Sequence, residues 1–566
     1  MERPLDRADA PWGWVALVVA VAVAASVAGV GNEFVQDDLV IVVQNPRMQS
    51  LDNWRDLLTQ PYWPPPWTED HWRPMTSLAL AVQFQLGGGE PLLFRIVSLL
   101  LYAVLSGAVL LLALRFLVPP AAVAAALLFA VHPLHVEAVA LAVGQAELIV
   151  ALLAVVMTAW YLRCRRTGQG WLRVRDWLLL VVLYLAAALT KEHGLVLPGL
   201  LVAAELTLVP GLVRARIRQS WPGFVVLAAV AVLAIQLRAL VLGGDLVGSY
   251  PSEALDGVAL GGRALTMLAV ATHWFRLLAW PAHLRADYAP AELEASTGFG
   301  GPEALGLALL GLAVAVTWRC RRGAPVTTFG LLWVAIALFP VSNVLVPTSI
   351  LIAERTLFLA TVGAVIAVGG LMDLAWRLEG RRTAIARAGV LAAGVLGLAL
   401  GLGRSVERWS VWRNETAYVA RTAQDAPRSF RAQRAYGEVL FQDGKRDEGM
   451  AAYGRALQYA PPGEAWRVRN DLARRHFEEG ASALAVQQLL ASREQTPGEQ
   501  ETWNYLVLGL LNLGEYPAAK REAEAALARG FSVEVFEDLR SLADTAMKAN
   551  VPAGAIRINV VRPESP

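Results

Sequence analysis

Long runs of Leu, Val and Ala fill this chain up to about residue 404, and many of them approach 20 residues in length. A helix needs roughly 20 mostly apolar residues to cross a bilayer, where every backbone N–H and C=O must be paired within the protein. The 566 residues are 56% hydrophobic and 17% charged, which is too apolar for a soluble enzyme of this length. The sequence therefore predicts an all-α, polytopic protein embedded in the lipid bilayer.

The length test indicates about eleven membrane spans. They lie at residues 11–30, 92–117, 119–133, 138–162, 176–191, 193–212, 221–242, 302–318, 326–344, 356–376 and 386–403. The segment 261–281 carries Arg263, His273 and Arg276, which favours an amphipathic helix lying in the interface, with a true span as the alternative. A cleaved signal peptide is the alternative for residues 11–30.

Short loops rich in arginine tend to stay in the cytoplasm, so they indicate the orientation of the chain. Five loops have this character, at Arg115, 163–175, 214–218, 319–322 and 377–387. All five fall on one side if the N-terminus is cytoplasmic and the segment 261–281 does not cross. We therefore expect an integral protein of a bacterial inner membrane, with its C-terminal domain outside the cytoplasm.

The remaining composition narrows the choice of partners. The formal net charge is only +2, so nothing indicates nucleic acid or another polyanion. Cys164 and Cys320 are the only cysteines, which leaves neither a disulfide framework nor a thiolate metal site.

A pattern of about 34 residues with two helices per unit begins near residue 430. Glycines recur at Gly444, Gly480 and Gly514, and Pro461 and Pro497 stand where a second helix would end. Three such units, followed by a capping helix at 531–548, predict a tetratricopeptide-repeat α-solenoid, with a generic array of helical hairpins as the alternative. Its concave surface would bind a peptide or protein segment.

These patterns divide the chain into successive parts. They are an N-terminal transmembrane helix at 1–30, a first extracytoplasmic loop with an Asp-Asp motif at 31–90, the remaining transmembrane domain at 91–404, a linker helix at 405–429, the repeats with their cap at 430–549 and a tail at 550–566.

Clusters of ionisable residues occur next to several spans, and such clusters usually line a functional site because charge near a bilayer is costly. Asp37 and Asp38 follow the first span and could accept a proton from a hydroxyl or hold a cation, or they could be a solvated pair capping a short helix. The same loop carries Arg73 among aromatic residues that suit an interfacial belt or a sugar-stacking surface.

Two further clusters lie in turns between spans. His132, His135 and Glu137 could ligate a metal or bind a lipid head group. Lys191, Glu192 and His193 could meet a phosphate, with a structural ion pair as the alternative.

Two last clusters contain Arg285 with Asp287, and Asn343 with Glu354 and Arg355. An arginine fork makes two hydrogen bonds to a phosphate or diphosphate. Together the clusters describe one polar face on the outer side of the membrane, as a transferase that uses a lipid phosphate would need.

The ordered series of motifs resembles the transmembrane and tetratricopeptide-repeat-containing family, membrane glycosyltransferases of the GT-C fold class that are related to the protein O-mannosyltransferases. The resemblance covers almost the whole chain. It rests on Asp37-Asp38 with Asn45-Pro46, Trp72-Arg73-Pro74, the run from Phe129 to Val139, Lys191-Glu192-His193-Gly194, Asp287-Tyr288, Pro340-Val341-Ser342-Asn343 and Ala353-Glu354-Arg355.

The resemblance implies transfer of a sugar from a polyprenyl-phosphate donor to an extracytoplasmic acceptor, with the repeats recruiting an acceptor protein. On that template Asp37 is the base and Asp38 positions it. The residues that would bind the lipid phosphate are Lys191, Arg285, Glu354 and Arg355. Those that would line the donor and acceptor pocket are Arg73, His132, His135, Glu137, Glu192, His193, Asp287 and Asn343. A divalent metal is left open, because Asp37-Asp38 suits either case.

The sequence also departs from the family pattern. Arg95 and Ser98 stand where relatives commonly have His and Asn, Gln145 and Glu147 where they have Arg and Asp, and Phe358 and Ala360 where they have Tyr and Pro. These departures leave the sugar open. They also leave two other functions open, a non-catalytic scaffold that binds partners through its repeats and transfer to a glycolipid or cell-wall glycan.

Overall fold

The computed structural model describes residues 11–67, 71–165, 172–244, 252–288, 290–377, 381–556 and 558. The C-terminal residues 559–566 of the predicted tail, and short stretches of the predicted loops, lie outside these ranges. The chain forms two compact units, Met1–Tyr288 with Glu294–Arg421, and Ala289–Leu293 with Thr422–Pro566. Every regular element in the described ranges is helical, which confirms the predicted all-α fold.

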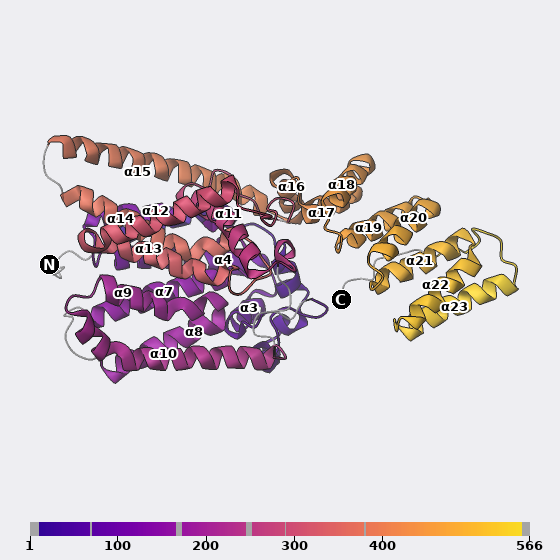
Figure 1. Cartoon of the computed structure of the whole chain (residues 1–566), viewed down its shortest axis with the longest axis horizontal. Helices are drawn as coiled ribbons and strands as arrows, with labels where there is room; N and C mark the ends of the chain where they lie inside the picture. Colours follow the sequence, from indigo (N-terminus) through magenta and orange to yellow (C-terminus); the bar gives the residue numbers. More distant parts are fainter. Residues whose placement is uncertain are drawn as a thin grey trace. The chain divides into compact units, whose positions relative to one another are not determined.

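The first unit is a bundle of long apolar helices with shorter helices between them (Figure 1). They are α1 (Trp12–Ser26), α2 (Trp54–Thr59), α3 (Pro74–Gly87), α4 (Pro91–Ala113), α5 (Pro119–Ala130), α6 (His135–Ala140), α7 (Gln145–Cys164), α8 (Val174–Thr190), α9 (Leu197–Thr207), α10 (Val213–Val241), α11 (Leu260–Ala279), α12 (Gly301–Gly323), α13 (Pro325–Leu338), α14 (Phe358–Arg377) and α15 (Arg381–Arg408). In Figure 1, α7, α8 and α10 lie alongside one another, as do α12, α13 and α14.

Seven helical segments in the described ranges are long and apolar enough to cross a membrane. They contain α1, α4, α7, α10, α12, α14 and α15, and each coincides with a predicted span. The predicted spans at 119–133 and 326–344 form shorter apolar helices, α5 and α13, and those at 176–191 and 193–212 form α8 and α9. The segment 261–281, expected to lie in the interface, forms α11 and is not one of the seven.

One predicted span has a different start. The sequence pattern places a span at 138–162, whereas the chain ends α6 at Ala140 and begins α7 at Gln145. Gly144 permits this break, because a Cβ there would collide with the carbonyl of Ala138. The break leaves the backbone amides of Ala142 and Val143 outside any helix, where they bind a side chain of the site described below.

Helices α13 and α14 approach closely through glycine. A Cβ at Gly330 would collide with the backbone of Gly363 and Ala367, and a Cβ at Gly370 would collide with Thr327. Small residues at such positions let helices pack in a membrane, where burial against lipid-like side chains provides little driving force. The packing of α14 matters because the turn at its N-terminus carries Glu354 and Arg355.

The loop predicted at 31–90 is itself structured. It holds a short π-helix at Leu39–Val43, the helix α2 and the 14-residue helix α3. Pro74 begins α3 and Gly88, with φ +62°, ends it in the left-handed conformation that suits glycine. The Trp72 indole donates to the carbonyl of Leu58, so this tryptophan holds the loop together.

The second unit consists of helical hairpins. The pairs are α17 (Phe430–Gln442) with α18 (Arg446–Tyr459), α19 (Ala465–Glu478) with α20 (Ser482–Gln495) and α21 (Gln500–Leu513) with α22 (Tyr516–Ala528), followed by α23 (Val533–Lys548). The recurring glycines of the repeat pattern, Gly444, Gly480 and Gly514, lie in the turns of the three hairpins with φ between +74° and +79°. The helix pairs have the bounds and order expected of tetratricopeptide repeats.

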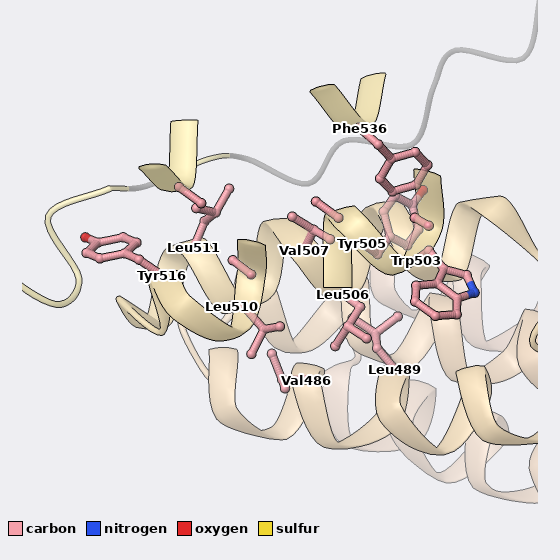
Figure 2. Close-up of a cluster of buried hydrophobic side chains, with 14 of the residues drawn as sticks. Val486, Leu489, Trp503, Tyr505, Leu506, Val507, Leu510, Leu511, Tyr516 and Phe536 are labelled. Atoms are coloured by element: carbon pink, nitrogen blue, oxygen red, sulfur yellow. The ribbon is translucent and has the colours of Figure 1, made fainter. Parts of the chain in front are cut away.

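Side chains from neighbouring hairpins form shared cores in this unit, a large one that includes Leu506 and a smaller one that includes Tyr453. Figure 2 shows Leu506 and Leu510 of α21 pointing toward Leu489 and Val486 of α20, while Phe536 of α23 packs against the same cluster. Neighbouring hairpins thus bury their apolar faces against each other, as in other stacked-repeat arrays.

Candidate active site

The Asp37-Asp38 pair lies just after α1, and the two carboxylates have different surroundings. Asp38 is completely buried. Its oxygens accept hydrogen bonds from the amides of Ala142 at 2.9 Å and Val143 at 3.0 Å, and Arg95 approaches to 3.2 Å. Burial raises the pKa of Asp38, and the Arg95 guanidinium and the two amides oppose this rise. Protein groups therefore enclose Asp38, which suits it to positioning its neighbour.

Asp37 keeps 18% of its side chain exposed and faces a different cation. Its Oδ2 lies 2.9 Å from Nη1 of Arg355, which comes from the 3₁₀ turn Glu354–Leu357 at the start of α14. The preceding residue, Gln36, has φ +54°, an uncommon conformation for a residue with a side chain. A strained turn thus presents the more accessible of the two carboxylates to an arginine from a distant part of the sequence.

Glu137 from α6 binds the same arginine. Its Oε2 accepts the backbone amide of Arg355 at 3.0 Å, and its Oε1 lies 3.7 Å from the Nε atom. Arg355 is therefore shared by two carboxylates, which gives these three side chains a net negative charge. We call Asp37, Asp38, Arg95, Glu137 and Arg355 the Asp37 cluster.

A second cluster forms around the turn after α8. Glu192 accepts hydrogen bonds from Arg73 at 2.8 Å and from Arg238 of α10 at 2.7 Å, so one carboxylate is shared by two guanidinium groups. Lys191 pairs with Glu147 of α7. We call Arg73, Glu147, Lys191, Glu192 and Arg238 the Glu192 cluster, and its formal charge is positive.

The two clusters influence each other electrostatically. Burial lowers the pKa of Lys191, Glu147 raises it, and both Arg73 and Arg355 lower it further. Burial also raises the pKa of Tyr62, with opposing contributions from Arg73 and Arg355 on one hand and Asp37 on the other. The Tyr62 ring lies 5.3 Å from the Arg73 guanidinium. The predicted motifs at 37–38, 73, 137, 191–192 and 355 therefore come together.

The short turn at Lys191-Glu192-His193-Gly194 depends on its glycine. A Cβ at Gly194 would collide with the carbonyl of Ala187 in α8, so the chain can reverse this tightly only with glycine there. The Thr76 hydroxyl donates to the carbonyl of Thr190 at 2.7 Å, which fixes the turn against α3. His193 is buried beside Lys191, and burial lowers its pKa, which favours the neutral imidazole.

The two histidines of the 132–137 motif have other partners than a metal. Both ring nitrogens of His135 face hydroxyl groups, Tyr102 at 2.9 Å and Thr361 at 2.8 Å. His132 contacts the carbonyl of Leu278 at 3.3 Å through Nε2. Among the residues that the structure describes, no three His, Cys, Asp or Glu side chains form a metal-binding group. Of this motif, Glu137 reaches the Asp37 cluster and His135 supports the fold around it.

The segment that carries the predicted residues Arg285 and Asp287 is bound by Glu354. Its side chain is buried and accepts the backbone amide of Arg285 and, at 3.4 Å, the hydroxyl of Tyr288. Arg408 at the end of α15 lies 3.8 Å from it. Glu354 thus ties the segment that carries Arg285 and Asp287 to the turn that carries Arg355.

Asn343 differs from the other predicted site residues. It is completely buried, and its side-chain oxygen accepts the Thr348 amide at 2.6 Å while its amide group donates to the Ile350 carbonyl at 3.2 Å. Its φ of +53° suits asparagine better than most residues. The side chain is therefore occupied in shaping the loop from 343 to 351.

Three residues of these clusters were not predicted as site residues. Arg95 and Glu147 were noted only as departures from the family pattern, and Arg238 was placed within an apolar span. A charged residue inside a span is itself a signal that a partner lies nearby. For Arg238 that signal was present in the sequence, but its partner, Glu192, could not be inferred without the fold.

These features define a class of protein: an integral membrane protein with buried acid–base clusters beside its spans and an array of helical hairpins. No family model matches the chain. Protein O-mannosyl-transferase TMTC4 of Mus musculus is 26% identical over 476 residues, covering 75% of this chain and 63% of the mouse protein. The human protein of the same name is 25% identical over 513 residues, covering 80% of this chain and 67% of that protein.

A shorter match has a higher identity. Protein O-mannosyl-transferase Tmtc2 of Drosophila melanogaster is 34% identical over 194 residues, covering 32% of this chain and 20% of the fly protein. The chain spans only about two thirds of the length of its mouse and human relatives. The comparisons confirm the resemblance to the transmembrane and tetratricopeptide-repeat-containing family that the motifs indicated.

Proposed function

We propose that this protein is a membrane glycosyltransferase that moves a sugar from a polyprenyl-phosphate donor to a hydroxyl group of an extracytoplasmic protein. The contact between Asp37 and Arg355 carries the proposal, because it joins the candidate base and a candidate phosphate ligand. The names of the relatives, all protein O-mannosyl-transferases, support transfer to protein and make polyprenyl-phosphate mannose the first donor to test.

Asp37 is suited to act as the base. It is the more exposed aspartate of the pair, and Arg355 holds its carboxylate in one orientation. The acceptor oxygen would attack the anomeric carbon, the bond from this carbon to the phosphate oxygen would break, and the hydroxyl proton would pass to Asp37. The lipid phosphate would leave with the bonding electron pair. General-base catalysis of this kind is worth about 10²- to 10⁴-fold.

The opposite charges of the two clusters support different roles for them, one in binding the phosphate and the other in accepting the proton. Glu192 neutralises only one of the two guanidinium groups that it contacts, so the Glu192 cluster suits a phosphate. The Asp37 cluster has two carboxylates on Arg355 and suits a group that releases a proton. Arg355 would contact both the base and the leaving group, because a guanidinium has five N–H donors and can bind Asp37 and a leaving phosphate together.

Substitution of Asp37 tests the proposal. We expect Asp37→Asn and Asp37→Ala to lower transfer by about 10²- to 10⁴-fold while the apparent KM for the donor changes little. Asp52→Asn is the matched control, since Asp52 is an exposed aspartate of the same loop. The assay follows transfer of radiolabelled sugar from a polyprenyl-phosphate donor in liposomes. Full activity of Asp37→Ala would remove Asp37 from the mechanism.

Deletion of the chain after residue 425 distinguishes the acceptors, since it removes α17 to α23 and leaves the first unit complete. Loss of protein glycosylation is expected if the repeats recruit an acceptor protein. Undiminished transfer to a glycolipid would favour that acceptor instead. A folded full-length protein that binds no polyprenyl-phosphate sugar would favour a scaffold.

A further inference from the structure

The loop that carries Asp37 is bound at several points to the segment that follows the last membrane helix. The indole of Trp409 donates to the carbonyl of Ala25 at 2.8 Å, and Asn32 donates to the carbonyl of Trp409 at 3.2 Å. The amide of Glu33 donates to the carbonyl of Arg413 at 2.9 Å. Residues far apart in the sequence therefore form one hydrogen-bonded layer that begins at the end of α1 and leads toward Asp37.

The last contact of this layer reaches the residue next to Asp37. Oε2 of Glu415 accepts the backbone amide of Gln36 at 3.0 Å. Gln36 has φ +54°, a conformation that costs roughly 1 kcal/mol for a residue with a side chain and so needs support from its surroundings. The Gln36 side chain does not supply it, because its Oε1 is buried without a hydrogen-bond partner in the described part of the chain.

The negative charge of Asp37 also acts on Glu415. Burial raises the pKa of Glu415, the amide of Gln36 opposes the rise, and the carboxylate of Asp37 adds to it. Tyr418 lies three residues further along the same helix, α16 (Glu415–Asp425), and is nearly buried. Burial raises its pKa, and the negative charges of Asp287, Asp37 and Glu137 raise it further. Residues three apart share a helix face, so this face of α16 is directed at the Asp37 cluster.

We propose that Glu415 is a positioning residue for the transfer reaction, which holds the strained Gln36 peptide so that the Asp37 carboxylate faces the acceptor hydroxyl. The proposal rests on the function proposed above. It makes α16 part of the catalytic apparatus: the helix begins at Glu415, beside the catalytic loop, and the division between the two units falls within it, after Arg421. A deletion after residue 425 leaves this contact in place, whereas a change at Glu415 removes it with the repeats intact.

The two substitutions Glu415→Ala and Glu415→Gln test the inference. Alanine removes the acceptor for the Gln36 amide, whereas the side-chain oxygen of glutamine can still accept it. We expect Glu415→Ala to lower kcat for sugar transfer by about 10- to 100-fold, since small misplacements of a catalytic group have effects of this size. The KM for the polyprenyl-phosphate sugar should stay within about twofold, because Glu415 acts through the loop. Glu415→Gln should recover most of the rate.

Hydrogen exchange provides a readout that needs no substrate. In the full-length protein without donor, Glu415→Ala should speed exchange of the peptide that contains residues 34–39, and Glu415→Gln should restore protection. Glu407→Ala is the matched control, because Glu407 is an exposed glutamate in the last turn of α15 and pairs with Arg404, three residues before it in the same helix. This control should change neither kcat nor exchange of that peptide.

The outcomes separate the two proposals. Wild-type kcat and wild-type exchange in Glu415→Ala would overturn the positioning role, as would equal loss of rate in the alanine and glutamine variants. Absence of sugar transfer by the wild-type protein would overturn the proposed function. In that case faster exchange in Glu415→Ala, restored by glutamine, would still establish the contact between Glu415 and the loop.

Discussion

Arg95 offers the most direct test of how the candidate site is held together. It lies in α4, is 3% exposed, and its guanidinium contacts Asp38 at 3.2 Å. It also donates to the main-chain carbonyls of Asn32, Glu33 and Ala140. Arg95→Ala would leave the completely buried Asp38 without its countercharge.

The expected loss follows from these contacts. Breaking a buried ion pair from one side costs about 3–5 kcal/mol, because an uncompensated charge stays behind. The amides of Ala142 and Val143 still bind Asp38 in the variant, so we expect the lower end, about 3 kcal/mol. In a unit of this length the unfolding entropy is large, so the loss corresponds to a fall in Tm of about 3 to 4 °C. The Tm of Arg95→Lys should lie between those of the wild type and Arg95→Ala, because lysine keeps the charge but cannot reach several acceptors at once.

A double-mutant cycle separates the ion pair from the other contacts. Asp38→Asn removes the charge that Arg95→Ala exposes, so the double variant should lose about 2 kcal/mol less than the sum of the single losses. Thermal unfolding can be followed by intrinsic fluorescence, since the chain has 19 tryptophans. A Tm of Arg95→Ala within about 1 °C of wild type, or additive single losses, would refute the reasoning.

Two further predictions concern other parts of the fold. Gly330→Ala should destabilise the first unit by about 1–3 kcal/mol, because its Cβ would push α13 away from Gly363 in α14; an unchanged Tm would contradict this. In the second unit, Arg475 and Arg474 outweigh the effect of burial and lower the pKa of Glu438 to about 2. This pairing stabilises the repeats above about pH 4.5 and is lost as the pH falls toward 2, so hydrogen-exchange protection of α17 and α19 should fall over that range in wild type and much less in Glu438→Gln.

The positions of the helices could be predicted from the sequence where a length or a spacing along the chain is enough to define them. A run of about 20 apolar residues must cross a bilayer, so the seven helical segments that meet the length test coincide with predicted spans. Glycines that recur every 34 to 36 residues predict a repeat of paired helices, and Gly444, Gly480 and Gly514 each lie between the two helices of a pair. These signals are local, and no partner elsewhere in the chain is needed to interpret them.

The pairing of the site residues could not be predicted in the same way. The sequence indicates that Asp37 and Arg355 belong to one polar face, but which carboxylate each cation contacts depends on how the helices pack. Asp38 illustrates the difficulty, because two of its donors are backbone amides freed by the break between α6 and α7. The apolar pattern continues through that break, so nothing in the sequence marks it except Gly144.

The departures from the family pattern bear on whether the site is functional. A site that had lost its role would be expected to accumulate buried polar groups without partners, each of which costs about 1–3 kcal/mol. Three substituted polar residues have partners instead: Arg95 with Asp38, Gln145 with Gln83 at 2.8 Å, and Glu147 with Lys191. Ser98 is the exception, since its buried hydroxyl has no hydrogen-bond partner in the described part of the chain.

Phe358, which stands where relatives commonly have Tyr, also has close partners. Phe358 packs against His135 with ring centroids 4.5 Å apart, and the hydroxyl of Tyr102 meets Nδ1 of that histidine at 2.9 Å. Most of the substituted polar residues therefore have partners in the site, which favours a working site with an altered lining over an inherited remnant. Because the altered Glu147 pairs with Lys191, whereas Asp37 pairs with Arg355, we expect the departures to change which sugar is accepted and to leave the base unchanged. A donor other than mannose, transferred with the same dependence on Asp37, would be the expected result.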